Sequence, residues 1–229
     1  MKTQSEKWFE KFCANVDLVC RRISEEDNKT PDYQLRIDDQ SIIVEVKEFT
    51  RNKAEQASDR LLEERGYGEA LSNTPGDRVR KKIADSSAQI KAKTKGIYPS
   101  ILVLCDIKYG CGQIMGHTDP YNIRVGMYGL EQIHIAIPVD ASVSPYATGV
   151  SYGPKRKMTA DQNTSISAIG VLSTPNKDDI RLDVYHNIYA ANPLDPALIT
   201  GYEIRQYRLD DAESETTAQW KEIDVQNQP

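Results

Sequence analysis

The fold of this chain is decided by the stretch TPDYQLRIDDQSIIVEVK, which occupies residues 30–47. Two runs of strand-forming residues, Tyr33 to Ile37 and Ser41 to Lys47, flank a DDQ sequence in which aspartate favours a tight turn. The stretch therefore predicts a β-hairpin. Because side chains alternate along a strand, Glu45 and Lys47 share one face of its second strand.

An acid and an amine in this mostly aliphatic strand need a partner, because an unpaired buried charge is costly. Asp32 follows Pro31 at the start of the first strand, so the hairpin can carry its carboxylate back beside Glu45. Two carboxylates, together with water and phosphate oxygens, suit Mg²⁺. Lys47 would orient the attacking water and stabilise charge on phosphorus. The stretch predicts phosphodiester hydrolysis, with Asp32 and Glu45 as metal ligands.

The sequence around the hairpin predicts alternating helices and strands. Apolar spacing predicts a helix over Ser5 to Ala14 and then a strand over Leu18 to Ile23, although one longer helix reaching Ile23 also fits. The further expected elements are helices at Lys53 to Arg65 and Arg78 to Thr94, the second between Asp77 as N-cap and Gly96, and strands at Ile101 to Cys105, Gln132 to Ile137, Ile166 to Leu172, Ile180 to Tyr185 and Tyr202 to Leu209. This order predicts an α/β sandwich with a central mixed β-sheet flanked by helices.

Length and composition indicate one domain. The 229 residues contain no linker rich in Pro, Ser or Gly, so we expect a single domain over residues 1–208, with a surface excursion at about 50–77, a mobile loop at 145–165 and an acidic polar tail at 209–229. No apolar run approaches the ~20 residues of a membrane-spanning helix, and the polar N-terminus has no secretory core. The sequence predicts a cytoplasmic protein without a membrane partner.

Charge and motif content narrow the functional classes. The formal charge of -5 and the pI near 5.4 argue against a protein that coats nucleic acid by bulk attraction, although an enzyme needs only a local basic surface. The four cysteines lack CxxC spacing, so we expect free thiols and no zinc site. The absence of a P-loop, a dinucleotide fingerprint and a GxSxG elbow removes several competing enzyme classes.

Pro31-Asp32 followed by Glu45-Val46-Lys47 resembles the motif of the PD-(D/E)xK nucleases, which have the restriction-endonuclease-like fold. The resemblance covers the N-terminal half, from Glu6 to Asp106, in the family order of helix, hairpin, helix and strand. It implies a nuclease dependent on Mg²⁺, with Mn²⁺ as a substitute, that cuts DNA rather than RNA and acts as an endonuclease. Nucleases of this fold often pair two active sites on a duplex, so the resemblance also makes a homodimer an option.

The same resemblance implies helper residues on two helices. An acid on the first helix often joins the metal site, and Glu6 lies nearer the apolar face than Glu10, although both also suit an ordinary helix N-terminus. The helix after Asp77 commonly offers glutamine or basic side chains to the substrate. Here these are Gln89, expected to assist catalysis, and the candidate phosphate contacts Arg78, Lys82 and Lys93. A solvated helix face would also explain these lysines.

Two other readings of the motif stay open. A chain that keeps the nuclease fold only for nucleic-acid binding or assembly would agree with the acidic charge, but it would not need Asp32, Glu45 and Lys47 in an apolar setting. An accidental motif would be recognised if Asp32 and Glu45 pointed away from each other.

Overall fold

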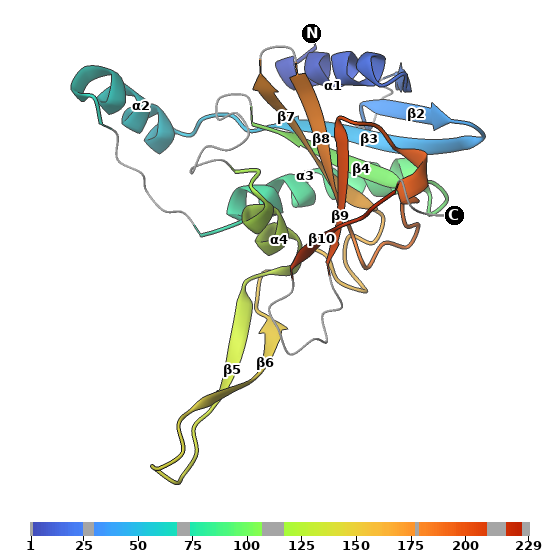
Figure 1. Ribbon diagram of the computed structural model, residues 1–229. Coiled ribbons are helices and arrows are strands. Elements are labelled where there is room, and N and C mark those ends of the chain that lie inside the picture. The colour runs from blue at the N-terminus through green and yellow to red at the C-terminus, as the bar shows by residue number, and fades with distance from the viewer. Residues whose placement is uncertain are drawn as a thin grey trace.

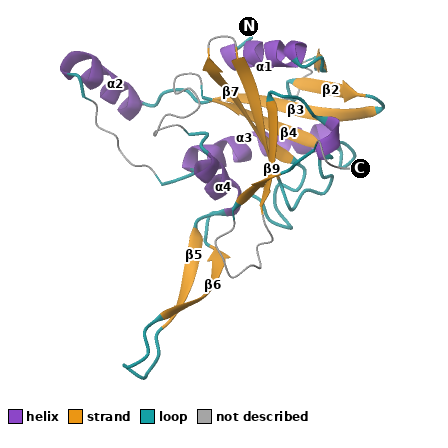
Figure 2. Cartoon of the chain, viewed as in Figure 1, coloured by secondary structure: helices purple, strands orange, loops and turns teal. Residues whose placement is uncertain are grey.

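The computed structural model describes residues 2–24, 30–67, 74–106, 117–176, 179–209 and 219–225. Within these ranges the chain is an α/β protein built on an eight-stranded mixed sheet with helices on both faces (Figures 1 and 2). The sheet order is β1 (Val19–Arg22), β2 (Tyr33–Ile37), β3 (Gln40–Glu48), β4 (Ser100–Cys105), β7 (Ala168–Asn176), β8 (Asp179–His186), β9 (Ile204–Leu209) and β10 (Trp220–Glu222). No helix in the described ranges combines the length and apolar character needed to cross a bilayer.

The middle of the sheet is parallel and its flanks are largely antiparallel. The β2–β3 hairpin is antiparallel, whereas β3, β4 and β7 run parallel to one another. Strand β4 is buried along its whole length, as expected for a strand covered on both faces. On the far side, β8 pairs antiparallel with β7 and parallel with β9.

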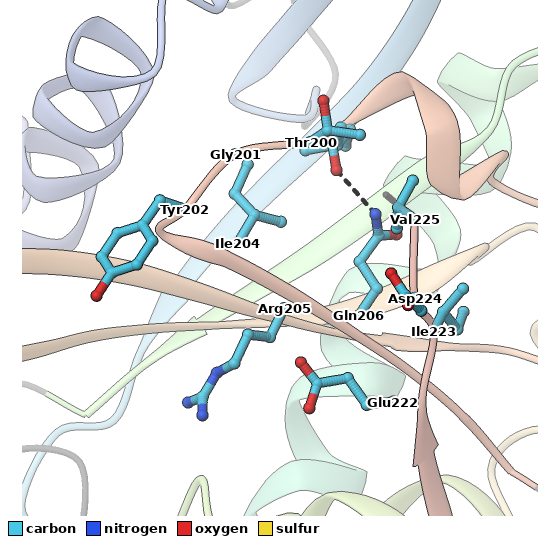
Figure 3. Close-up of a pocket in the computed structure, with 11 residues that line it drawn as sticks. Thr200, Gly201, Tyr202, Ile204, Arg205, Gln206, Glu222, Ile223, Asp224 and Val225 are labelled. Carbon is cyan, nitrogen blue, oxygen red and sulfur yellow. Dashed lines mark hydrogen bonds between the residues drawn. The ribbon is translucent and has the colours of Figure 1, made fainter. Parts of the chain in front are cut away.

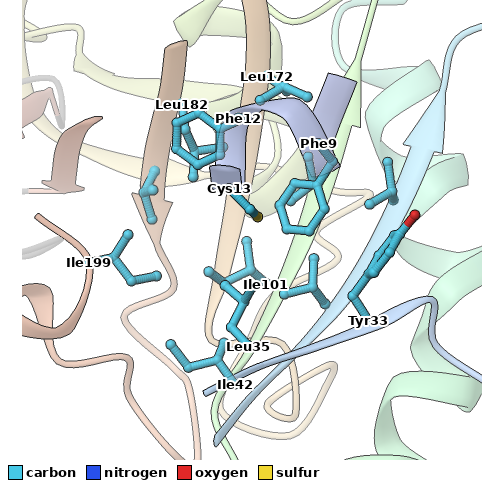
Figure 4. Close-up of a cluster of buried hydrophobic side chains, with 14 of the residues drawn as sticks. Phe9, Phe12, Cys13, Tyr33, Leu35, Ile42, Ile101, Leu172, Leu182 and Ile199 are labelled. Atoms are coloured by element: carbon cyan, nitrogen blue, oxygen red, sulfur yellow. The ribbon is translucent and has the colours of Figure 1, made fainter. Parts of the chain in front are cut away.

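Helix α1 (Gln4–Asn15) covers one face of the sheet. It begins with a capping box between Thr3 and Glu6, which satisfies two backbone N–H groups at its N-terminus. Phe9, Phe12 and Cys13 point from it into an apolar cluster formed with side chains of β2, β3, β4 and β8 (Figure 4).

Helix α3 (Asp77–Thr94) packs on the opposite face, where Val79, Ile83 and Ile90 are fully buried against β4. The remaining helices are α2 (Lys53–Arg65), α4 (Pro120–Tyr128) and the 3₁₀ turn η1 (Pro196–Leu198). Helix α4 packs beside α3, and its buried Ile123 and Met127 extend the same core. The sheet is therefore held between α1 on one side and the α3–α4 pair on the other.

Several sequence expectations are corrected by the structure. Part of the loop expected at 145–165 is strand β6 (Tyr146–Tyr152), which pairs with β5 (Glu131–Ala136) in a separate two-stranded ribbon. Part of the polar tail expected at 209–229 is strand β10, whose aromatic Trp220 packs against the core. The N-cap of α3 is Gly76 rather than Asp77, because Gly76 has the left-handed backbone that turns the chain into the helix.

Other expectations are confirmed or lie elsewhere. The segment after the first helix is strand β1, not a continuation of α1. Cys13, Cys20 and Cys105 are free thiols, while Cys111 lies outside the described residues, as do residues 210–218 and 226–229 of the expected tail. Helix α4 was not anticipated, because it is short and its surroundings contain many turn-forming residues.

A buried histidine predicts acid sensitivity of the fold. The Gln206 amide donates to the carbonyls of Pro196 and Ile199 at 2.7 and 2.8 Å, so its oxygen faces Nε2 of His186 at 2.8 Å. Burial lowers the pKa of His186 below its usual 6.5, so the folded state favours neutral imidazole. This stabilisation is present above the unfolded pKa and is lost as the pH falls below it. Between about pH 7 and 5, we expect the thermal stability of His186→Gln to depend less on pH than that of wild type. If the stability of both proteins changed equally with pH, buried neutral His186 would not be the cause.

Candidate active site

The hairpin places Asp32 beside the second half of β3. The register pairs Tyr33 with Val44, so Asp32, one residue earlier, lies level with Glu45 and on the same face of the sheet. Its Oδ2 accepts a hydrogen bond from the backbone N–H of Val46 at 2.8 Å. Its carbonyl accepts another from Ile23 of the neighbouring chain segment at 2.9 Å. Asp32 is thus fixed through both its side chain and its backbone.

Glu45 is a buried acid with little compensation. Its side chain is 1% exposed, and within the described part of the chain neither carboxylate oxygen accepts a hydrogen bond of acceptable geometry. Lys47, two residues along the same face, is in ion-pair contact with Glu45 Oε1. Burial, followed by the negative charge of Asp32, raises the pKa of Glu45 to about 7, against the opposing effects of Lys47 and Gln89.

Burial also raises the pKa of Asp32, while the Val46 N–H and the Lys47 ammonium act in the other direction. The two acids therefore disfavour each other's ionisation, and one added cation would relieve both. This arrangement does not agree with an accidental motif, in which the two carboxylates would point apart.

These residues fit a divalent cation of the Mg²⁺ type. Glu45 offers buried oxygens that accept no hydrogen bond of acceptable geometry within the described ranges, and Asp32 has one oxygen, Oδ1, that is not used by the Val46 N–H. Mg²⁺ commonly binds through only one or two protein carboxylates and keeps several waters. Among the described residues, no three His, Cys, Asp or Glu side chains are arranged to hold a metal, so the fit is to a two-carboxylate site.

The raised pKa of Glu45 predicts a pH-dependent stability. In the unfolded chain this acid has its ordinary pKa of 4.5, whereas the folded value is about 7. Folding therefore favours the protonated acid, and the stabilisation is lost as the pH rises through about 7, by on the order of 3 kcal/mol. Denaturant unfolding should show this decrease in wild type and not in Glu45→Gln. Mg²⁺ should stabilise wild type more above pH 7 than below it. If the free energy of unfolding changed equally with pH in wild type and Glu45→Gln, the raised pKa would not belong to Glu45.

Basic and aromatic side chains border the site on the α3 side. Gln89 lies close enough to Glu45 to lower its pKa, although its buried Nε2 forms no hydrogen bond of acceptable geometry with a described residue. Lys82, two turns earlier on α3, has its Nζ 5.7 Å from the ring centre of Phe49, just past the end of β3. Burial and the nearby Lys47 lower the pKa of Lys82. Lys47 and Lys82 therefore form a local positive region on an acidic protein.

Two predicted site residues, Glu6 and Arg78, have other partners. Oε2 of Glu6 accepts from the backbone N–H of Thr3 at 2.6 Å, and Oε1 pairs with Arg22 at 3.0 Å. Glu6 is close enough to raise the pKa of Asp32, and its Oε1 accepts no hydrogen bond of acceptable geometry from a described residue. Because no three acids in the described ranges are arranged to hold a metal, the role of Glu6 as a third ligand stays a prediction.

Arg78 also has a structural role rather than a free guanidinium. It donates to Glu55 Oε1 at 2.7 Å and to the Thr50 carbonyl at 2.6 Å, and so ties α2 to α3. Lys93 lies eleven residues beyond Lys82 on the same helix, roughly 16 Å along its axis. Gln89, which lies beside Glu45, is only four residues or roughly 6 Å from Lys93 along this axis, so the substrate contact of Lys93 stays a prediction.

Sequence reasoning missed two residues beside the site. Phe49 is 7% exposed and packs against both Arg78 and Lys82. Its position two residues after Lys47 was an available signal. Arg22 lowers the pKa of Asp32, but its position depends on the pairing of β1 with β2, which no local pattern reveals.

A cavity of about 730 Å³ lies at the other end of the sheet, where the segment from Ile199 to Gln206 faces residues 222–225 (Figure 3). The arginine in its lining, Arg205, already forms two hydrogen bonds with Asp183, at 2.9 and 3.2 Å. All the residues that line the cavity lie within 199–206 and 222–225, so it shares no residue with the Asp32–Glu45 site.

Comparisons of the chain with protein-family models, with curated proteins and with solved structures give no match. The functional argument consequently depends on the geometry and chemistry of the site itself.

Proposed function

We propose that the chain is a Mg²⁺-dependent phosphodiesterase that cuts DNA, and that Asp32, Glu45 and Lys47 form its catalytic centre. The observation that carries the proposal is the buried Glu45 carboxylate, which accepts no hydrogen bond of acceptable geometry from a described residue, lies beside a second acid and contacts a lysine. A purely structural acid at 1% exposure would be expected to have hydrogen-bond donors.

Each residue has a distinct part in the proposed reaction. Asp32 and Glu45 would hold Mg²⁺, which would polarise the phosphodiester and lower the pKa of a bound water. The Lys47 side chain is 31% exposed, so its ammonium can reach a substrate while it stays beside Glu45. There it would orient the attacking water and stabilise negative charge on the phosphoryl oxygens. Gln89 and Lys82 would position the substrate backbone from α3.

The arrangement of elements agrees with a restriction-endonuclease-like fold, which we propose as the finer description. The elements α1, hairpin β2–β3, α3 and buried β4 follow one another in the order that the PD-(D/E)xK resemblance implies, with β1 added before the hairpin and α2 after it. The acidic pair lies at one end of the hairpin, where β3 runs parallel to β4. The chain beyond β4 would then supply substrate preference, and this part has no counterpart in the resemblance.

The direct test is metal-dependent cleavage of plasmid, linear and single-stranded DNA. Wild type should cut with Mg²⁺ or Mn²⁺ and be inactive with EDTA, and Asp32→Asn should be inactive with either metal. Asp39→Asn is a matched control, since Asp39 is exposed in the turn of the same hairpin. An Asp32→Asn protein that cuts at the wild-type rate would refute the proposed centre.

A second function, nucleic-acid binding without cleavage, is favoured by one observation. The Lys47 ammonium is in ion-pair contact with Glu45 and offsets part of its charge, so the site can persist in the folded state without a cation. Under this alternative, Mg²⁺ would leave the thermal unfolding of wild type unchanged, and DNA would bind without being cut. A metal-induced stabilisation that disappears in Asp32→Asn would exclude it.

A further inference from the structure

Two cysteines lie side by side where helix α1 meets β1, the strand at one edge of the described sheet. Cys13 belongs to the last turn of α1, and Cys20 is the second residue of β1. Between them the chain turns at Asp17, which has φ +54°, and the N–H of Leu18 donates to the Cys13 carbonyl at 2.9 Å. The two side chains are in hydrogen-bond contact, and both are free thiols. The turn therefore brings two reduced sulfurs together.

The side-chain directions of both elements explain this contact. Side chains alternate along β1, so Cys20 and Arg22 share one face of the strand. Helix α1 covers this face, because Arg22 pairs with Glu6 of the helix at 3.0 Å. Glu6 and Cys13 are about two turns apart on α1, so they also share one face. The Glu6–Arg22 pair is thus one end of the contact between α1 and β1, and the two cysteines are the other.

The two cysteines differ in access and in the charge that they favour. Cys13 is 1% exposed and points into the apolar cluster, whereas Cys20 is half-buried at the edge of that cluster (Figure 4). The hydrogen bond from Cys13 lowers the pKa of the Cys20 thiol against the effect of burial. The same hydrogen bond, followed by burial, raises the pKa of Cys13. Of the nearby charges, Glu10 disfavours both thiolates and Lys2 favours that of Cys20. The thiolate is therefore favoured on the less buried cysteine.

We infer that Cys13 and Cys20 form a redox modification site, at which a peroxide oxidises Cys20 and Cys13 then closes a disulfide between α1 and β1. The thiolate is the form of cysteine that reacts with oxidants, and exposure adds to its susceptibility. Cys105, the third described cysteine, is fully buried, and burial raises its pKa to about 12, so it should stay reduced. The inference is independent of the proposed nuclease chemistry and requires neither metal nor nucleic acid.

The oxidation balances in two steps. The Cys20 thiolate attacks one oxygen of hydrogen peroxide, which forms an S–O bond, breaks the O–O bond and releases hydroxide that solvent protonates. The resulting sulfenic acid removes the thiolate that accepted from Cys13, so the largest effect that raises the pKa of Cys13 is lost. The Cys13 sulfur then attacks the Cys20 sulfur. The S–S bond forms, the S–O bond breaks, and the Cys13 proton leaves with the hydroxyl group as water.

The test is peptide mapping of the folded protein after treatment with hydrogen peroxide, without metal or DNA. Trypsin cleaves after lysine and arginine, so residues 12–21 are released as one peptide that contains both cysteines. After oxidation this peptide should be lighter by two hydrogen atoms, and it should resist alkylation by iodoacetamide until dithiothreitol is added. Cys105 is the internal control, since it should be alkylated in the unfolded protein to the same extent with and without peroxide.

Two variants establish the order of attack. In Cys20→Ser the thiol that meets the oxidant is gone, so Cys13 should stay reduced. In Cys13→Ala the sulfenic acid at Cys20 has no partner, so dimedone should trap it there. Circular dichroism checks that both variants fold, and the mapping of wild type depends on neither.

Wild type in which peroxide leaves both thiols free for alkylation would overturn the inference. So would a disulfide that links either cysteine to Cys111 or to a second chain. Dimedone that reacts at Cys13 in Cys20→Ser, and not at Cys20 in Cys13→Ala, would overturn the assigned order of attack.

Discussion

Replacement of Lys47 by alanine is expected to reduce metal-dependent DNA cleavage by at least ~10²–10³-fold, the loss seen when one charge-stabilising group is removed from an active site. The ammonium contacts Glu45, and the Lys47 side chain is 31% exposed, so it can reach a substrate. Without it, the two acids repel each other with less compensation, so the pKa of Glu45 should rise further above about 7. The variant should therefore lose activity and also need a higher pH for Mg²⁺ to stabilise it.

Two lysines of α3 provide the comparison for this result. Lys81 has a side chain that is 73% exposed and pairs with Asp85 at 3.2 Å, so Lys81→Ala should cut as wild type does. Lys82→Ala should weaken substrate binding, which would appear in KM with a smaller change in kcat. Initial rates on plasmid DNA, measured beside thermal unfolding, separate these effects from misfolding. If Lys47→Ala retained full kcat, Lys47 would have no role in the chemical step.

The hairpin was predictable because its signals are local. The alternation of side-chain direction along β3 and the aspartate turn determine which residues face each other, and this is enough to bring Asp32 level with Glu45. The buried face of α3 was predictable in the same way, from the helical spacing of Val79, Ile83 and Ile90.

The remaining features depend on contacts between distant segments. Glu6 has the spacing of a site residue, but its partners Thr3 and Arg22 are determined by the capping box and by the position of β1. Arg78 was assigned to substrate because the sequence gives no indication that Glu55, 23 residues earlier, folds back onto it. Periodicity describes one element at a time, and so it cannot say which charged side chains already have a partner.

The two-stranded ribbon of β5 and β6 was also missed because it depends on a contact between separate segments. Segment 145–165 contains glycines, prolines and polar residues, a composition that is typical of a loop. Residues Tyr146–Tyr152 nevertheless form a strand, because β5 offers its edge as a pairing partner. Strand propensity depends on such neighbours more than helix propensity does.

Replacement of Gly76 by alanine should destabilise the fold by ~2–5 kcal/mol, which combines ~1–2 kcal/mol for a left-handed alanine with ~1–3 kcal/mol for overpacking. Gly76 has φ +71°, and a Cβ there would lie 2.6 Å from the backbone nitrogen of Gly126 and 2.9 Å from the carbonyl carbon of Val125. Backbone atoms of α4 cannot rotate away as a side chain can. The contact is also held by the Gly76 N–H, which donates to Asn122 Oδ1 at 2.7 Å.

Gly66 is the matched control, since it has φ +76° at the end of α2 and no described atom within 4 Å of the added Cβ. Gly66→Ala should cost only the ~1–2 kcal/mol of the left-handed backbone. Denaturant unfolding of both variants therefore isolates the contact between α3 and α4, and equal losses would show that the helices do not approach this closely. Helix α3 also carries Gln89 and Lys82, so Gly76→Ala should lower DNA cleavage even under conditions where the protein remains folded, whereas Gly66→Ala should not.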